Sequence, residues 1–265
     1  MTMRKLWYVP VAFTLLFVLS GIACAKWTSD GLKTEDRDVS GFSEVVVGFA
    51  GKVILEQGDT EGLTIEADSD VIDEIVTEVR GRRLVIEYKT KNWGWGGWNR
   101  GNERATITVR FKNLSAVTLS GSANLTCKTL KSDDLDLTVS GSGDMWFGEI
   151  SASWIESGIS GSGTITADNV TAERVRGRIS GSGDIEMSGT AGTIQLGISG
   201  SGSVDMSQLA VKEADVRISG SGGIRVNVSD ELTGTVSGSG NVWYKGRPIV
   251  DVSTPGSGDV RHVRG

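Results

Sequence analysis

The stretch Ser180-Gly181-Ser182-Gly183, flanked by Ile179 and Ile185, decides the fold of this 265-residue chain because it recurs at an almost constant interval. Further copies of Ser-Gly-Ser-Gly begin at residues 140, 160, 199, 219 and 237, and degenerate copies begin at Ser120 and Pro255. Successive copies are therefore separated by 20, 20, 20, 19, 20, 18 and 18 positions. A short motif repeated at such a period is the signature of stacked structural repeats.

Apolar residues alternate with polar residues on both sides of each copy. The residue just before the motif is Leu119, Val139, Ile159, Ile179, Ile198, Ile218 or Val236. The residue five places after the first motif residue is Leu125, Met145, Ile165, Ile185, Val204, Ile224, Val242 or Val260. Alternation with a period of two predicts half-buried strands. The glycines between them predict a sharp corner, since glycine adopts backbone angles closed to other residues.

One repeat is thus a strand, a corner, a second strand and a looser return, for example at Ser151–Trp154 or Thr171–Arg174. A single repeat cannot bury its apolar face, but stacked repeats can. We therefore predict an all-β chain that forms one parallel β-solenoid of ~20-residue repeats. Parallel crossovers are right-handed, so the solenoid should coil in that sense.

The N-terminus reads as a targeting segment. Arg4 and Lys5 precede an apolar run, and Gly21-Ile22-Ala23-Cys24 follows it. Residues 1–23 are therefore predicted to be a signal peptide, with Cys24 lipidated in the manner of a bacterial lipoprotein. Cleavage by the general signal peptidase after Ala25 is the alternative, and Cys24 would then leave with the leader.

The remaining chain divides into three parts. Residues 24–41 are polar and charged, which predicts a flexible tether. Residues 42–119 are predicted to form an atypical capping region of diverged turns, and residues 120–265 the regular solenoid. Within the cap, Val45, Val47, Val53 and Leu55 surround Gly48 as in a repeat, and the spacing over Val71–Val79 suggests a short helix.

Three stretches together resemble a known bacterial family. They are Phe42-Ser43-Glu44-Val45-Val46-Val47, the segment Glu78–Ile86 and the iterated Ile-Ser-Gly-Ser-Gly-Asp-Ile motif, preceded by a leader with a candidate lipobox. The pattern is similar to the auto-transporter adhesin, head GIN domain family, over roughly Phe42 to Val260. The resemblance implies a secreted or lipid-anchored β-solenoid whose biochemical role is undetermined.

A tryptophan-rich loop is the candidate binding site. Trp93, Trp95 and Trp98 lie among glycines, with Asn92, Asn99 and Arg100 beside them. Such a loop can offer an aromatic platform to sugar rings or to an apolar partner, with the polar side chains as hydrogen-bond donors. Alternatively, the loop folds back and covers one end or flank of the solenoid.

Few residues offer catalytic or metal-binding chemistry. His262 is the single histidine, and no metal-ligand cluster or phosphate loop is evident, so we predict no catalytic residue, metal or cofactor. Aspartates follow the motif only at Asp144, Asp184 and Asp259, whereas stacked calcium sites need carboxylates on adjacent turns. Cys127 occupies an inward position and reads as a buried small hydrophobe rather than a reactive thiol.

Charge limits the partners. The chain has 27 Lys and Arg against 33 Asp and Glu, a net charge of −6, which argues against nucleic acid. We expect an exported, non-enzymatic cell-envelope protein that binds a glycan or an envelope protein and is held at the membrane through Cys24, or is secreted or periplasmic. The alternative is a polysaccharide lyase or hydrolase on a β-helix scaffold, with Glu173, Arg174, Arg176, Arg178, Asp215 and Arg217 as its solvent-facing charges.

The lipidation hypothesis makes a direct prediction. Replacing Cys24 with Ser removes the only thiol that the lipobox could modify, so the protein should move from the membrane fraction to the soluble fraction. Fractionation followed by mass spectrometry of the N-terminus checks this. A soluble wild-type protein that begins at Lys26 would show that the leader is cleaved by the general signal peptidase instead.

Overall fold

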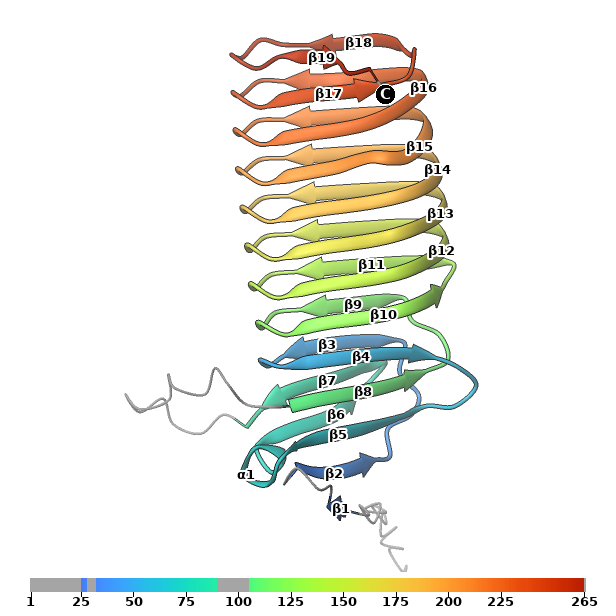
Figure 1. Ribbon diagram of the computed structural model, residues 1–265, viewed down its shortest axis with the longest axis vertical. Helices are drawn as coiled ribbons and strands as arrows, with labels where there is room; N and C mark the ends of the chain where they lie inside the picture. Colours follow the sequence, from blue (N-terminus) through green and yellow to red (C-terminus); the bar gives the residue numbers. More distant parts are fainter. Residues whose placement is uncertain (1–24, 28–31, 90–104, 265) are drawn as a thin grey trace, which may run out of the picture.

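The computed structural model describes residues 25–27, 32–89 and 105–264, and these form a tall column of strands (Figure 1). The capping end contains β1 (Ala25–Trp27), β2 (Leu32–Arg37), β3 (Glu44–Gly48), β4 (Lys52–Gln57), β5 (Gly62–Asp68), α1 (Ser69–Ile72), β6 (Ile75–Arg80), β7 (Arg83–Tyr88) and β8 (Ala105–Phe111). The regular part contains β9 (Ala116–Leu119), β10 (Asn124–Lys131), β11 (Asp134–Val139), β12 (Asp144–Ile159), β13 (Thr164–Ile179), β14 (Asp184–Ile198), β15 (Ser203–Ile218), β16 (Gly223–Val236), β17 (Asn241–Lys245), β18 (Ile249–Ser253) and β19 (Val260–His262).

Each turn of the column is one coil of a parallel β-solenoid, which confirms the predicted fold class. From β9 onward every strand pairs in parallel with the strand one turn away, as in Ile165↔Ile185 and Ile179↔Ile198. The Ser-Gly-Ser-Gly corners stack along one edge and the returns along the other, and the chain coils right-handed (Figure 1). Strands β12 to β16 continue through the return without a break. The looser return that was expected is seen only as shifts of the pairing register, between Ala167 and Val170, between Glu186 and Ser188 and between Met206 and Ala210.

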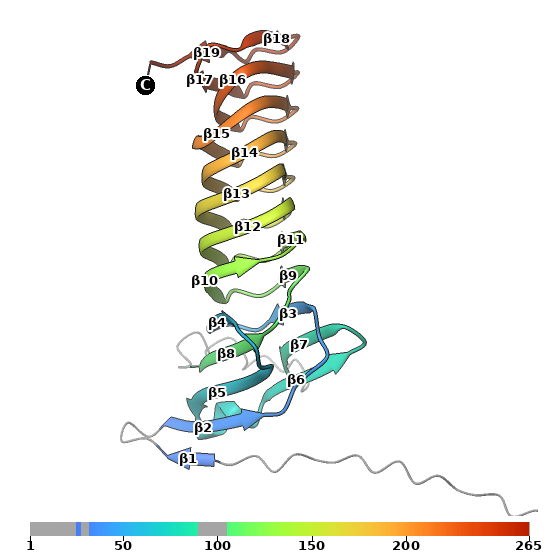
Figure 2. The same cartoon turned by 90° about the vertical axis from the view of Figure 1, so that its right-hand side faces the viewer.

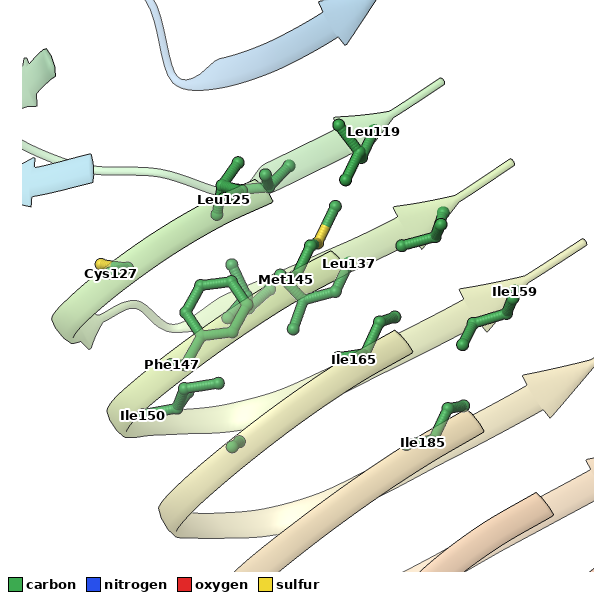
Figure 3. Packing of buried hydrophobic residues seen from close by; sticks show 14 of the residues in the cluster. Leu119, Leu125, Cys127, Leu137, Met145, Phe147, Ile150, Ile159, Ile165 and Ile185 are labelled. Atoms are coloured by element: carbon green, nitrogen blue, oxygen red, sulfur yellow. The ribbon is translucent and has the colours of Figure 1, made fainter. Parts of the chain in front are cut away.

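The interior is filled by the alternating apolar residues. Leu125, Met145, Ile165 and Ile185 stack in one ladder (Figure 3). Val139, Ile159 and Ile179 stack in the facing one. Ile198 is 2% exposed, as its place in the repeat predicted. The one buried polar side chain among the described residues is Ser157, whose Oγ donates to the carbonyl of Arg176 at 3.1 Å.

The corners require glycine because neighbouring turns approach each other closely there, and not because the backbone adopts unusual angles. None of them has a positive φ, so the conformational reason expected from the sequence is wrong. A Cβ on Gly161 would lie 1.8 Å from the carbonyl oxygen of Gly141, and one on Gly163 would lie 1.9 Å from that of Gly143. Any side chain at these places would push neighbouring turns apart.

Backbone hydrogen bonds tie each corner to the one below it. The Ser160 N–H donates to the carbonyl of Val139 at 2.9 Å, and the Ser162 N–H donates to that of Gly141 at 3.1 Å. Some serine hydroxyls add a bond, as between Ser237 Oγ and the Ile218 carbonyl at 3.3 Å. The corners are therefore a stacked hydrogen-bonded edge and not a set of independent turns.

The capping end includes one early turn of the solenoid. Strands β3 and β4 pair in parallel with β9 and β10, with Val47 opposite Leu119 and Val53 opposite Leu125. This confirms residues 44–57 as a diverged turn around Gly48. Strands β7 and β8 lie beneath β3 and β4, again in parallel. Antiparallel strands β2, β5 and β6 then close this end of the column (Figure 2).

Two expectations for the capping end are wrong. Leu32–Arg37 is strand β2 and not part of a flexible tether, because it pairs with β5 along its whole length. Arg37 fixes it further by donating to the carbonyls of Ile75, at 2.7 Å, and Ile72, at 3.2 Å. The helix expected over Val71–Val79 is limited to Ser69–Ile72, and β6 follows as the hairpin partner of β7.

The close approach at the corners predicts a contrast between two nearby glycines. A Cβ on Gly200 would lie 1.9 Å from the Gly181 carbonyl oxygen, whereas a Cβ on Gly197 would meet no atom within 4 Å. Gly200→Ala should therefore lower the melting temperature sharply, while Gly197→Ala should leave it unchanged or raise it slightly. Thermal unfolding followed by circular dichroism compares the two. Equal melting temperatures would contradict the stacked-corner geometry.

Candidate functional site

A groove runs along the outer face of the strand segments that precede the corners. We call it the flank groove. Its volume is about 650 Å³. It is lined by Thr138, Gly158, Ile159, Ser160, Arg178, Ile179, Ser180, Gly197, Ile198, Ser199, Arg217, Ile218, Ser219, Thr235 and Ser237. The outward side chains come from two columns, the first corner serines and the residues two places before them.

Two glycines create the hollow. Gly158 and Gly197 occupy the outward column that elsewhere carries Thr138, Arg178 and Arg217. A Cβ at Gly197 would meet nothing within 4 Å, so the space above it is open. Arg178 and Arg217 are the in-register neighbours of Gly197 on either side. Their backbones are therefore two strand spacings apart, about 9–10 Å, with the gap between them.

The two arginines differ in how they are held. Arg217 Nη2 lies 2.8 Å from Asp215 Oδ2, a close ion pair. Arg178 Nη1 lies 3.8 Å from Glu156 Oε1, too far for a hydrogen bond, and its side chain is 64% exposed. The Arg178 guanidinium therefore keeps donors directed at solvent, which a carboxylate or sulfate could engage in a forked pair.

A second row of polar side chains borders the flank groove. Arg176 donates to Gln195 Oε1 through Nη2 at 2.7 Å and lies 3.9 Å from Glu156. Arg176 and Arg174 both stack over the Trp154 ring, each with its guanidinium carbon 5.1 Å from the ring centroid. These contacts hold the row in one arrangement.

The opposite outer face carries two more tryptophans. Trp146 is 37% exposed, and its Nε1 donates to Asp168 Oδ2 at 3.1 Å. It borders a smaller hollow of about 420 Å³ with Lys52, Ile54 and Lys128. The guanidinium group of Arg225 stacks on the ring of Trp243, with its central carbon 4.8 Å from the ring centroid. This hollow is smaller than the flank groove and lies over the first turns of the solenoid.

The binding and lipidation residues predicted from the sequence lie outside the described residues. These are Cys24, Trp93, Trp95, Trp98, Asn99 and Arg100. The strands on either side are described, and β7 and β8 continue the paired segments of the turns above. The platform hypothesis remains a prediction.

The sequence analysis identified the charged residues near the flank groove but did not predict that they lie together. Arg176, Arg178 and Arg217 were expected only to face solvent, and the structure brings Arg178 and Arg217 to the two sides of one hollow. The sequence did contain one signal for the hollow, the pair Gly158 and Gly197. Both lie two places before a corner, a position at which other turns carry a larger side chain. To recognise this signal, one must know which positions of a repeat point into the solenoid and which point outward.

Catalytic groups are scarce in the described ranges. These ranges contain no group of three His, Cys, Asp or Glu residues placed to hold a metal ion. His262 lies in the last turn, with Nε2 3.0 Å from the Gly246 carbonyl oxygen. The lining of the flank groove includes no carboxylate. Glycoside hydrolysis uses a pair of carboxyl groups beside the scissile bond, and the carboxylates nearest this groove, Asp215 and Glu156, lie against Arg217 and Arg178.

The fold and the site define a class of protein. It is a capped parallel β-solenoid with a charged groove on one flank. The chain belongs to the family described as "Putative auto-transporter adhesin, head GIN domain", whose sequence profile matches residues 41–248. This confirms the resemblance carried by the iterated motif and the opening of the cap. A search of curated proteins gives no match.

Solved structures from two Parabacteroides species share the fold. A protein from Parabacteroides distasonis described as a "Putative lipid binding protein" is 26% identical, with a TM-score of 0.80, covering 89% of this chain and 98% of that one. A "putative adhesin" from Parabacteroides merdae is 23% identical, with a TM-score of 0.81, covering 89% of this chain and 97% of that one. Within the described ranges, no helix has the length and hydrophobicity needed to span a bilayer.

Cys127 is the remaining candidate for reactivity, and its surroundings oppose it. The residue is 1% exposed, and its Sγ lies 3.4 Å from the Thr129 carbonyl oxygen. Burial raises the pKa of the Cys127 thiol from 9.0 to about 12, so the thiol is protonated at neutral pH.

This burial predicts that Cys127 is inert in the folded protein. A disulfide reagent such as DTNB should modify it at pH 8 only after unfolding in guanidinium. Because the folded-state pKa is the higher one, the thiol's contribution to stability is complete below about pH 9 and is lost as the pH rises towards 12. Rapid labelling of Cys127 in the native protein would contradict the inward assignment.

Proposed function

We propose that this protein is a non-enzymatic binding protein of the bacterial cell envelope, of the adhesion type, that holds an acidic glycan along the flank groove. The observation that carries the proposal is the placement of Arg178 and Arg217 on the two sides of the hollow over Gly197. The family, described by an adhesin name, supports a role at the cell surface.

The chemistry of the groove suits a sugar chain with carboxylate or sulfate groups. Arginine offers a planar fork that matches such groups, and Arg178 is only loosely engaged by Glu156. The serines that line the groove at Ser160, Ser180, Ser199, Ser219 and Ser237 add hydroxyls that can donate to or accept from sugar hydroxyls. Successive turns repeat these groups at about 4.8 Å, so the surface favours an extended ligand.

The net charge of −6 limits how the ligand is recognised. At this net charge the protein as a whole repels an acidic polymer at long range, so affinity must come from short contacts with the guanidinium groups. Binding should therefore depend on Arg178 and Arg217 more than on the overall charge of the protein.

Two untested features fit the same role. Export and lipidation at Cys24 would place the solenoid outside the cytoplasm, attached at its capped end. The residues Trp93, Trp95 and Trp98, with Asn99 and Arg100, would add an aromatic contact for the same kind of ligand. Against the enzyme alternative, the lining of the flank groove holds no carboxylate, and the nearby Asp215 and Glu156 face the arginines Arg217 and Arg178.

A binding measurement with defined sugars tests the proposal. Isothermal titration should detect an oligomer of galacturonic acid and not the corresponding neutral galactose oligomer. Arg178→Ala and Arg217→Ala should each weaken binding about tenfold or more, the usual loss for a hydrogen bond to a charged group. Arg225→Ala, which removes a stacked guanidinium from the other face, is the matched control and should bind normally.

A second variant tests the hollow itself. Gly197→Leu places a side chain into space that is empty in the wild type, so it should block the acidic oligomer while the melting temperature holds. Equal affinity for both oligomers, or binding that survives the arginine changes and Gly197→Leu together, would overturn the proposal. Cleavage of the oligomer during the titration would favour the enzyme alternative.

A further inference from the structure

The two ends of the column differ. The N-terminal end is closed by β2, β5 and β6, whereas the last turn, β18 and β19, has no strand above it in the described chain (Figure 1). Ile249, Val250 and Val263 are 75%, 40% and 38% exposed, and with Trp146 they are the exposed large hydrophobic residues of the described ranges. Three of these four therefore lie at the open end.

The open end also presents unused backbone groups in a definite pattern. In the turns below, the residue just before a corner directs its carbonyl upward, as Ile218 does to the Ser237 N–H. By the alternation of a parallel ladder, Val250 and Val252 of β18 direct their N–H and C=O groups out of the end. On β19, the Asp259 carbonyl and the Val263 N–H bond downward to Val242 and Tyr244, so Val260 and His262 face out.

We propose that this end is the docking surface for a second copy of the chain, which pairs with it end to end. The two copies are related by a two-fold axis that lies between the two ends and runs parallel to the strands. This rotation places the β18 side of one copy over the β19 side of the other and leaves the direction of each strand unchanged. It therefore brings β18 of one copy antiparallel to β19 of the other, twice. The result is a closed, isologous contact that covers both open ends at once.

One register satisfies the backbone and the side chains together. With Val250 opposite His262 and Val252 opposite Val260 of the second copy, each pair has its N–H and C=O groups directed at the other. Val252 and Val260 are then about equally far from their corners, so the corners of the two copies align. Val252 and Val260 pack against the apolar interior and continue it across the contact, while the His262 imidazole keeps its contact with the Gly246 carbonyl oxygen.

The outward side chains of this register are complementary. Asp251 falls opposite Arg261 of the second copy, and Ile249 falls opposite Val263 of the second copy. Opposite charges directly across an antiparallel pair are stabilising, and apolar pairs likewise. Arg261 already lies beside Asp259 in its own chain, and its fork can contact both carboxylates. The Asp–Arg pair occurs twice by symmetry, which argues for a second copy over an unrelated partner.

Charge reversal tests the register. The wild type should sediment as a dimer, and Asp251→Lys and Arg261→Glu should each sediment as monomers because like charges then face each other. The double variant Asp251→Lys/Arg261→Glu restores opposite charges and should recover the dimer. Asp59→Lys reverses an exposed charge at the capped end and is the matched control, which should remain dimeric. Circular dichroism confirms that each variant is folded.

A disulfide trap gives an independent reading. The pair Asp251 and Arg261 is a non-hydrogen-bonded pair in this register, with Cα atoms about 4.5 Å apart, within the range of a disulfide. Asp251→Cys/Arg261→Cys should give a covalent dimer under oxidation, while the single cysteine variants should not. Within one chain the two residues lie on opposite outer faces, so they cannot bridge each other.

The outcomes separate cleanly. A monomeric wild type at micromolar concentrations overturns the proposal. A dimer that survives both single charge reversals, or a double variant that stays monomeric, shows that the copies meet through another surface or register. Covalent dimers from the single cysteine variants as readily as from the double variant would also reject this register.

Discussion

The contact between each corner and the carbonyl oxygens one turn below is the constraint on which the rest of the structure depends. A methyl group on Gly163 would lie 1.9 Å from the Gly143 carbonyl oxygen, so the turns can stack at strand spacing only because no side chain is there. With the corners fixed in this way, every residue has a set distance from the corner edge. Inward positions then form ladders such as Ile165 and Ile185, and outward positions form the columns that make the flank groove.

The sequence predicted most of the fold because a solenoid repeats in one dimension. The period placed the corners, and the alternation placed Ile179 and Ile198 in the interior, where they are 2% exposed. It failed where the chain does not repeat. Strand β2 is polar and looked like a tether, yet it is held by pairing with β5 and by Arg37, whose partners Ile72 and Ile75 are more than thirty residues away. No local pattern reports such contacts.

The candidate site was less predictable than the fold. The residues Arg178, Gly197 and Arg217 belong to three different turns, and their alignment depends on a turn of 19 residues among turns of 20. Reading them as one site needs the register across each return, where single residues are dropped or gained between Ala167 and Val170 and between Glu186 and Ser188. The tryptophan loop stands apart, because it lies outside the described residues.

The same register shifts show where the fold accepts changes in length. Between Met206 and Ala210 the pairing jumps while the corner at Ser219 stays aligned with Ser237, so the return edge absorbs every insertion and deletion of the regular turns. For protein engineering, this edge is a graft site. A short peptide inserted into the returns of successive turns would be displayed as a vertical array with a pitch of about 4.8 Å, on a scaffold whose opposite edge holds the spacing.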